Sequence, residues 1–461
     1  MAVLSSDLIR QGASGASTGY TIDQSIKFNA SNNAYMHRTP SSTGNRKTFT
    51  SSFWVKLGNV EVNTALPTPQ VTHGVGSSGL ALVANEGTLT AYTYYSGSWS
   101  GFLKTNRVFR DPSAWYHIVY IVDSTQAILT ERIRIYINGV RETSFSTESY
   151  LAQNQDTDWN LSGEKMWIGR DGSGSGYDGE YYAADIYWLD GYAYGPEYFG
   201  EFKEDTDIWI PKAYEGSFGT NGFHIDGRDA SDLGDDESGN GNDFTTSGLS
   251  TFDQRTDSPT NNHATWNPLV NRHTTYANGN VEATMTTSNK WTKAVMTMTL
   301  PNTGTWYWEG TEFNPENDPA TALGIVDSDV ERLDDNGVSN RFSSPMGTFT
   351  GIVVYSGPGQ SLATWVYKNG SETSQSGAVI ISTSRLGFLW EPENNRFTIY
   401  DDGSQHTQFT SVNAGNYVFG AQQATGGVTL NYRIFVEAND WTQTPSGITS
   451  ANALNTANIG S

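Results

Sequence analysis

The stretch Arg-Ile-Arg-Ile-Tyr-Ile-Asn-Gly at residues 132–139 decides the fold class. Its isoleucines alternate with polar or larger residues up to Ile137, which is the pattern of a strand with one buried face. Asn138 and Gly139 both tolerate positive φ, and such a pair after an alternating run indicates a tight β-hairpin. Asn369-Gly370 and Asp402-Gly403 follow similar runs. The sequence therefore predicts sheets that are mostly antiparallel.

The rest of the sequence agrees with an all-β protein. Residues 48–57 and 115–122 are rich in β-branched and aromatic residues, and we expect both to be central strands. The 461 residues include 48 glycines and 13% aromatics but only 16% charged residues, whereas coiled coils and long helical arrays favour Ala, Glu, Lys and Leu. One helical turn is predicted to start at Gly195-Pro196.

The distribution of small and acidic residues divides the chain. Residues 12–19 are small and polar, so they cannot form a core element, and the stretch 226–257 is acidic and poor in apolar residues. We therefore expect two antiparallel, jelly-roll-like β-sandwich domains with three connecting or terminal segments. The predicted segments are an extended N-terminal arm at 1–20, a sandwich at 21–225, an acidic linker at 226–265, a second sandwich at 266–437 and a C-terminal tail at 438–461.

The charge balance limits the partners. The net charge is −22, which repels phosphate backbones and anionic membranes, so we expect no nucleic-acid partner. No apolar run approaches the ~18 residues of a membrane-spanning helix, and we expect no membrane insertion. The chain contains no cysteine, so neither disulfides nor thiolate metal sites contribute to its stability.

Four segments in order resemble a known domain family. They are Phe-Thr-Ser-Ser-Phe-Trp-Val-Lys (49–56), Trp-Tyr-His-Ile-Val (115–119), Ile-Arg-Ile-Tyr-Ile-Asn-Gly (133–139) and Met-Trp-Ile-Gly-Arg (166–170). They resemble the strands of a laminin-G-like domain of the concanavalin A-like lectin/glucanase superfamily. The resemblance covers about residues 20–225 and implies a two-sheet sandwich.

The C-terminal half shows a second resemblance. Trp-Tyr-Trp-Glu (306–309), Arg-Leu-Gly-Phe (385–388), Phe-Thr-Ile-Tyr-Asp-Asp-Gly (397–403) and Val-Thr-Leu-Asn-Tyr (428–432) resemble successive strands of a SPRY-type domain. This resemblance covers about residues 266–437. It implies a bent β-sandwich that is used for binding.

Three further phrases resemble structural and tail-fibre-like proteins of tailed phages. They lie at residues 4–13, 38–48 and 453–458. The resemblance implies a virion protein that is assembled in the host cytoplasm and contacts other virion proteins through its N-terminal arm. It also implies copies arranged as a trimer or ring. The sequence lacks the long fibrous shaft of many such proteins, so tail and capsid locations both remain open.

The motifs for catalysis are weak. Glucanases of the lectin-like superfamily need two carboxylates flanking one glycosidic bond, and the nearest candidates here are Asp185 and Asp190. Their offset of five residues places them on opposite faces of a regular strand. The seven histidines form no metal-binding pair. We therefore expect no enzymatic activity, no catalytic residue, no metal site and no cofactor.

The acidic stretch 232–243 leaves an alternative open. It supplies closely spaced carboxylate and amide oxygens, which calcium prefers, but it lacks the order of an EF-hand loop and its final glutamate. We favour a solvated acidic turn and keep a calcium site as the alternative.

Exposed aromatic rings beside polar groups suit sugar binding. The run 94–102 is the strongest candidate, because it resembles a loop that combines aromatic residues with Ser and Gly, and a second group lies at 177–182. The predicted carbohydrate-binding residues are Tyr94, Tyr95, Trp99, Tyr177, Tyr181 and Tyr182. The alternative for these aromatics is a place in the core or at a subunit interface.

Three functions follow from these features. The first is a tail fibre or appendage adhesin that binds host surface glycans. The second is a capsid decoration or connector protein with purely structural contacts. The third, a polysaccharide-degrading glycosidase, is disfavoured because the sequence lacks a suitable pair of carboxylates.

Overall fold

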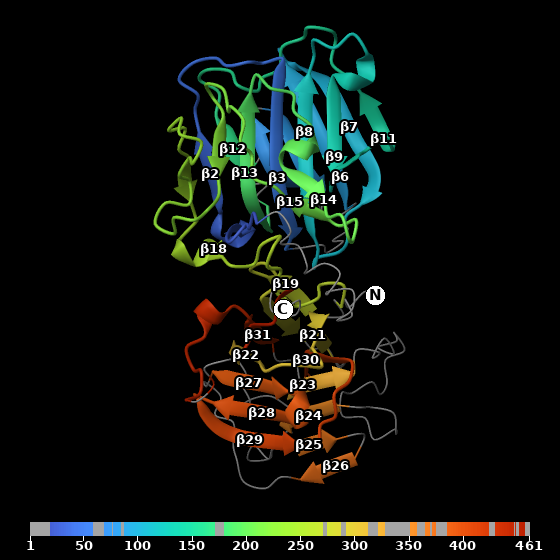
Figure 1. Cartoon of the computed structure of the whole chain (residues 1–461), viewed down its shortest axis with the longest axis vertical. Helices are drawn as coiled ribbons and strands as arrows, with labels where there is room; N and C mark the ends of the chain where they lie inside the picture. The colour runs from blue at the N-terminus through green and yellow to red at the C-terminus, as the bar shows by residue number, and fades with distance from the viewer. Residues whose placement is uncertain are drawn as a thin grey trace. The chain divides into compact units, whose positions relative to one another are not determined.

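A computed structural model gives the fold of most of the chain (Figure 1). It describes residues 19–58, 69–75, 77–83, 87–170, 179–270, 274–286, 292–311, 321–327, 351–356, 365–368, 371–374, 385–423, 429–446, 448 and 451–456. These residues fall into two units, one ending at Asn262 and the other starting at His263. Among them, no helix is long and apolar enough to cross a membrane.

The predicted hairpins form at the expected positions. Asn138 and Gly139 adopt φ values of 48° and 77° between strands β9 (Ile133–Ile137) and β10 (Val140–Arg141). Asp402 and Gly403, with φ of 45° and 77°, join β28 (Arg396–Asp401) to β29 (Ser404–Thr410). Asn369-Gly370 lies outside the described residues. The antiparallel fold class is confirmed, since every ladder between named strands in the described chain is antiparallel.

The first unit is a sandwich of two sheets. We name one the covered sheet, and its strands in order are β10, β9, β8 (Trp115–Asp123), β3 (Thr48–Leu57), β13 (Tyr181–Asp190), β1 (Ser25–Phe28) and β18 (Gln254–Arg255), with β16 (Phe223–Ile225) also pairing with β13. We name the other the open sheet, and its strands in order are β11 (Phe145–Ser149), β7 (Ser98–Val108), β6 (Thr88–Tyr95), β5 (Ser78–Val83), β4 (Pro69–Val75), β12 (Met166–Ile168), β2 (Tyr35–Arg38) and β17 (Thr245–Ser247).

The two sheets differ in what lies on their outer faces. The inner faces share one apolar core, to which Phe49 and Phe53 of the covered sheet and Leu80 and Leu103 of the open sheet contribute. The covered sheet is buried on its outer face as well, because the chain after β13 folds back over it. Strands β2, β7 and β12 of the open sheet instead alternate between buried and more exposed residues, which is typical of a sheet with one solvated face. Most described residues of β5 and β6, between them, are buried.

The segment that covers the outer face of the covered sheet follows β13 directly. It contains the short hairpin of β14 (Gly200–Phe202) and β15 (Trp209–Pro211) and the predicted helical turn, which is the 3-10 helix η3 (Pro196–Tyr198). Phe199 and Tyr214 of this segment pack with Val119, Ile121 and Leu189. The other 3-10 helices of the described chain are η1 (Ala30–Asn32), η2 (Leu129–Glu131), η4 (Thr251–Asp253), η6 (Pro392–Asn394) and η7 (Ala438–Asp440).

The expectation of an acidic linker at 226–265 is wrong. Leu233 and Phe244 lie in the core of the first unit, and β17 pairs with β2. Asp257 forms a buried ion pair with Lys56 at 2.7 Å. The acidic residues are therefore structural parts of the first unit, and the unit extends to Asn262 rather than ending at 225.

The second unit is also built from two antiparallel sheets (Figure 1). One sheet has the order β19 (Thr274–Ala277), β20 (Glu282–Thr286), β31 (Thr429–Phe435), β22 (Trp306–Thr311), β27 (Leu386–Glu391), β28 and β29. The other has the order β21 (Thr292–Thr299), β30 (Tyr417–Gln423), β23 (Thr321–Asp327), β24 (Gly351–Ser356), β25 (Trp365–Lys368) and β26 (Ser371–Ser374). Trp308, Phe388 and Phe419 pack together in the core between them.

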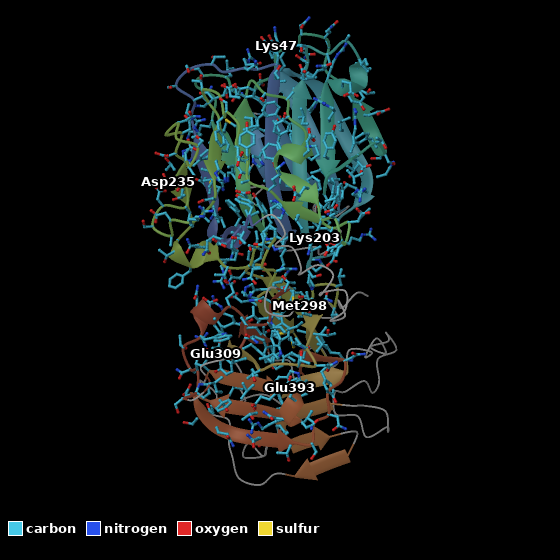
Figure 2. The ribbon with its side chains drawn as sticks, in the orientation of Figure 1. Lys47, Lys203, Asp235, Met298, Glu309 and Glu393 are labelled. Carbon is cyan, nitrogen blue, oxygen red and sulfur yellow. The ribbon has the colours of Figure 1, made fainter. Side chains whose placement is uncertain are left out.

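The C-terminal segment is not a free tail. Leu454 is fully buried in the core of the second unit, and its carbonyl accepts a hydrogen bond from the Ala264 amide. The buried carboxylate of Glu309, labelled in Figure 2, accepts hydrogen bonds from the backbone amides of Thr442 and Gln443 and pairs with Arg385 at 2.5 Å. The predicted tail at 438–461 is therefore wrong for its described part, which completes the second unit.

Candidate functional site

The aromatic run 94–102 forms a β-hairpin rather than a loop. Strands β6 and β7 of the open sheet meet at Ser96 and Gly97, whose φ values of 49° and 86° suit a tight turn. The register pairs Tyr94 with Trp99 across the strands, and the ladder shifts next to this pair. The hairpin therefore fixes the position of both rings through backbone pairing.

Trp99 lies at the centre of a small aromatic surface. This residue is 61% exposed, which is unusual for one with so large an apolar side chain. The rings of Tyr94, Tyr92 and Phe102 meet it edge to face at centroid distances of 5.4, 5.5 and 6.2 Å. Such pairs hold an aromatic ring in place. We name these four residues the Trp99 cluster.

Tyr95 does not belong to this cluster. Adjacent residues on a strand point to opposite faces, and the guanidinium of Arg46 lies 5.4 Å from the Tyr95 ring. Arg46 in turn pairs with Asp156 and Asp158 at 3.6 and 3.7 Å. The structure therefore brings Tyr94 and Trp99 together and anchors Tyr95 in a separate charged network.

Tyr181 and Tyr182 are both buried, so the prediction that they bind carbohydrate is wrong. They lie on β13, a strand that is buried on both faces. Tyr181 stacks on Phe28 in the core at 5.0 Å, and Tyr182 packs against Trp115 on the outer side of the sheet. Neither ring can present a face to a sugar. Tyr177 lies outside the described residues.

Sequence reasoning missed Tyr92 and Phe102 as members of the surface. Tyr92 lies two residues before Tyr94 on the same strand, so strand periodicity places both rings on one face. Phe102 pairs with Tyr92 across the ladder. The alternation within residues 88–95, combined with a hairpin turn at Ser96-Gly97, is the signal that could have identified them.

The two candidate catalytic carboxylates contact separate groups. Asp185 lies at a bulge in β13 with φ of 53°, so the strand is not regular there. Its carboxylate accepts hydrogen bonds from the Tyr20 hydroxyl at 3.1 Å and lies 2.6 Å from Nε2 of His224. The Asp190 carboxylate instead accepts from the backbone amides of Asn45 and Asn221, at 2.6 and 3.0 Å. The two side chains thus hold different parts of the fold.

The network around Asp185 is a tightly packed polar cluster. The ring of His224 stacks on Tyr187 at 4.1 Å, and the hydroxyls of Tyr20 and Tyr187 lie 3.3 Å apart. Burial, and then the charge of Asp185, raise the pKa of both tyrosines well above the ordinary value. The hydroxyls therefore remain protonated at neutral pH and act as hydrogen-bond donors rather than nucleophiles.

Two other histidines are buried and uncharged. Burial lowers the pKa of His73 and His117 to about 3. His117 accepts a hydrogen bond from Trp209 at Nδ1, at 3.0 Å, so its Nε2 carries the proton towards the Ser52 hydroxyl at 2.8 Å. The ring lies between Trp54 and Trp209, which gives it a structural role in the core.

The acidic stretch 232–243 is organised by its own backbone. Oδ1 of Asp236 accepts hydrogen bonds from the amides of His224 and Ser238, and Oδ2 accepts from the amide of Asn242. Asp243 accepts from the amide of Asp236 at 3.1 Å. Within the described part of the chain, no three acidic or histidine side chains are placed to share a cation.

Several solved structures are similar to parts of this chain. The SPRY domain of human HERC1 has 13% identity and a TM-score of 0.29, covering 37% of this chain and 96% of that one. The heptameric SAP-like pentraxin from Limulus polyphemus has 14% identity and a TM-score of 0.28, covering 38% and 79%. The TRIM65 PSpry domain has 14% identity and a TM-score of 0.29, covering 38% and 91%.

The sequence comparison is more specific for the first unit. No curated protein sequence matches this chain. Residues 29–187, however, match the family model Laminin_G_3, described as the concanavalin A-like lectin/glucanases superfamily. This range runs from before β2 to β13 and includes the hairpin that carries the Trp99 cluster. Residues 29–187 are therefore similar to the domains of the concanavalin A-like lectin/glucanase superfamily.

Proposed function

We propose that this protein is a tailed-phage virion protein that binds host surface glycans through the Trp99 cluster. The observation that carries the proposal is the position of Trp99: a tryptophan that is 61% exposed, held by three aromatic neighbours, on the solvated face of a lectin-type sandwich. A large apolar ring held in water by its neighbours indicates a binding surface rather than a packing element.

The chemistry of the Trp99 cluster suits sugars. A sugar ring has apolar C–H faces that stack on an aromatic ring, and its hydroxyls can bond with nearby polar groups. Here the side chains of Tyr92 and Tyr94, which carry hydroxyls, contact the Trp99 ring. Because the rings are already fixed by the hairpin, little conformational entropy is lost on binding.

The virion assignment rests on the sequence resemblance at residues 4–13, 38–48 and 453–458. An exposed aromatic surface of this size binds a glycan weakly at each site, so useful affinity requires several copies that engage the same cell surface. A trimer or ring would supply these copies. We therefore propose a homo-oligomer on the virion, docked through its N-terminal arm, with the open sheet available to the host.

A glycan-array experiment tests the binding function. The purified full chain should bind a defined subset of glycans, and Trp99→Ala should reduce that signal at least tenfold, as expected for a central tryptophan of a binding site. Phe252→Ala is the matched control, since Phe252 is an aromatic residue of the same unit that is 77% exposed and lies in η4. Binding that is absent, or equal in both variants, would contradict the proposal.

Electron microscopy tests the virion location. Antibody against this chain should label a defined structure on purified phage particles. Labelling at tail appendages supports the adhesin, whereas labelling over the capsid together with an empty glycan array supports the decoration or connector protein. Particles without any labelling would contradict the virion assignment.

A further inference from the structure

A second aromatic cluster lies on the open sheet. Trp167 of β12 stacks on His37 of β2 at 5.0 Å, and Tyr35 meets Trp167 edge to face at 5.4 Å. All three side chains are half-buried, and they alternate with the core residues Met36, Met166 and Ile168. They therefore lie on the solvated face, as the Trp99 cluster does. We name Tyr35, His37 and Trp167 the Trp167 cluster.

The register of the open sheet connects the two clusters. Trp167 pairs with Gly74 of β4, Gly74 pairs with Gly79 of β5, and Gly79 pairs with Tyr92 of β6. One row across the strands thus runs from one cluster to the other through two glycines. A side chain at Gly79 would collide with the Tyr92 ring, so this ring lies over β5 and points the aromatic surface towards Trp167.

The spacing sets the size of a ligand that could use both clusters. Three inter-strand steps separate Trp167 from Tyr92, and at ~4.8 Å per step this is about 14 Å. That length exceeds one sugar ring. A ligand that touches both clusters must therefore be a chain of several units that crosses the strands.

The charge around the Trp167 cluster differs from that of the whole chain. Nζ of Lys165 lies 5.2 Å from the Trp167 ring, and the guanidinium of Arg170 lies 4.1 Å from the Tyr35 ring. Burial, and then the charge of Lys165, lower the pKa of His37. In a chain of net charge −22, two cations therefore flank a half-buried aromatic surface. Cations next to stacking rings are suited to carboxylated or phosphorylated sugars.

We infer that the open sheet binds an extended, negatively charged glycan chain that lies across its strands, from the Trp99 cluster to the Trp167 cluster. This inference rests on the proposed function and adds the ligand's charge and length. The chain stacks on the aromatic rings at both ends, and the Tyr92 ring, which covers Gly79, carries the aromatic surface part of the way between them. Lys165 and Arg170 attract its acidic groups.

The test uses acidic polysaccharides of known structure. Alginate, hyaluronan and polygalacturonate chains of increasing length are titrated against the full chain, together with their carboxyl-reduced forms. At least one acidic chain should bind, with an affinity that rises with length and falls about tenfold on carboxyl reduction. If no acidic chain binds more tightly than its reduced form, the inference is overturned.

Variants separate this inference from the proposed function. Trp167→Ala should weaken binding of the long acidic chain about tenfold and leave binding of short fragments unchanged, whereas Trp99→Ala should weaken both. Lys165→Gln, which keeps the side-chain stem, should weaken the acidic chain only, and it serves if Trp167→Ala fails to fold. An effect of Trp99→Ala without any effect of Trp167→Ala or Lys165→Gln would refute the inference while the proposed function stands.

Discussion

The buried carboxylate of Asp257 provides a sharp test of how the acidic segment belongs to the first unit. Its Oδ2 lies 2.7 Å from Nζ of Lys56, and its Oδ1 accepts a hydrogen bond from Nε1 of Trp115 at 3.0 Å. The Lys56 and Asp257 side chains are only 1% and 2% exposed. Asp257→Asn offers one acceptor oxygen where two donors need one each, and it removes the carboxylate charge that faces Lys56.

The expected loss follows from this burial. Removing one partner of a buried ion pair costs about 3–5 kcal/mol, so Asp257→Asn should lower the free energy of unfolding by that amount. For a unit of this size, about 2–4 °C per kcal/mol gives a fall in Tm of about 6–20 °C, measured by calorimetry on the full chain. Asp205→Asn is the control, because the Asp205 side chain is 67% exposed and its Oδ2 lies 3.7 Å from Nζ of Lys203, as in a weak surface ion pair.

A second substitution checks the cause. Adding Lys56→Met to Asp257→Asn removes the buried ammonium group that faced the carboxylate and should restore much of the lost stability. If Asp257→Asn costs less than about 1 kcal/mol, or if Lys56→Met only adds to the loss, the segment is not held by this pair and the reasoning fails.

Three further predictions concern stability. The pKa of His73 and His117 is about 3 in the folded chain and 6.5 without burial, so between these pH values the unfolded chain binds more protons than the folded chain. The free energy of unfolding should therefore be highest above about pH 6.5 and should fall as the pH drops towards 3. In urea titrations, His73→Leu should reduce the difference in the free energy of unfolding between pH 7 and pH 4. An unchanged difference would contradict the lowered pKa of His73. Glu309 pairs with Arg385 and accepts hydrogen bonds from the amides of Thr442 and Gln443. Glu309→Gln should therefore lower the free energy of unfolding by about 3–5 kcal/mol and expose residues 440–443 to limited proteolysis. A digest identical to that of the unmodified chain would contradict the role of Glu309 in holding this segment. Millimolar calcium should leave Tm unchanged, because backbone amides occupy the oxygens of Asp236, whereas a rise reversed by chelator would support the calcium alternative.

Local patterns predicted the strands and turns well. Asn138-Gly139 and Asp402-Gly403 adopt the positive φ values that tight hairpins need, and Pro196 opens a short helix. The physical reason is that such turns depend on the conformational freedom of two or three residues and little on their surroundings. Patterns of this kind are therefore readable from sequence alone.

Burial by distant segments could not be predicted in the same way. Tyr181 and Tyr182 were expected at the surface, but residues far away in the sequence cover both sides of their strand. The acidic residues at 226–257 resembled a solvated linker by composition, yet Asp236 and Asp257 are buried with hydrogen-bond partners. Composition does not reveal whether a carboxylate is satisfied by water or by backbone amides and lysine.

Isothermal titration of an array-selected glycan into the full chain and its Trp99→Ala variant tests the central claim most directly. We expect binding by the unmodified chain and a loss of about 2 kcal/mol, or about thirtyfold in Kd, in Trp99→Ala, with the Phe252→Ala control unchanged. Equal Kd values for the unmodified chain and Trp99→Ala would show that the Trp99 cluster is not the glycan site.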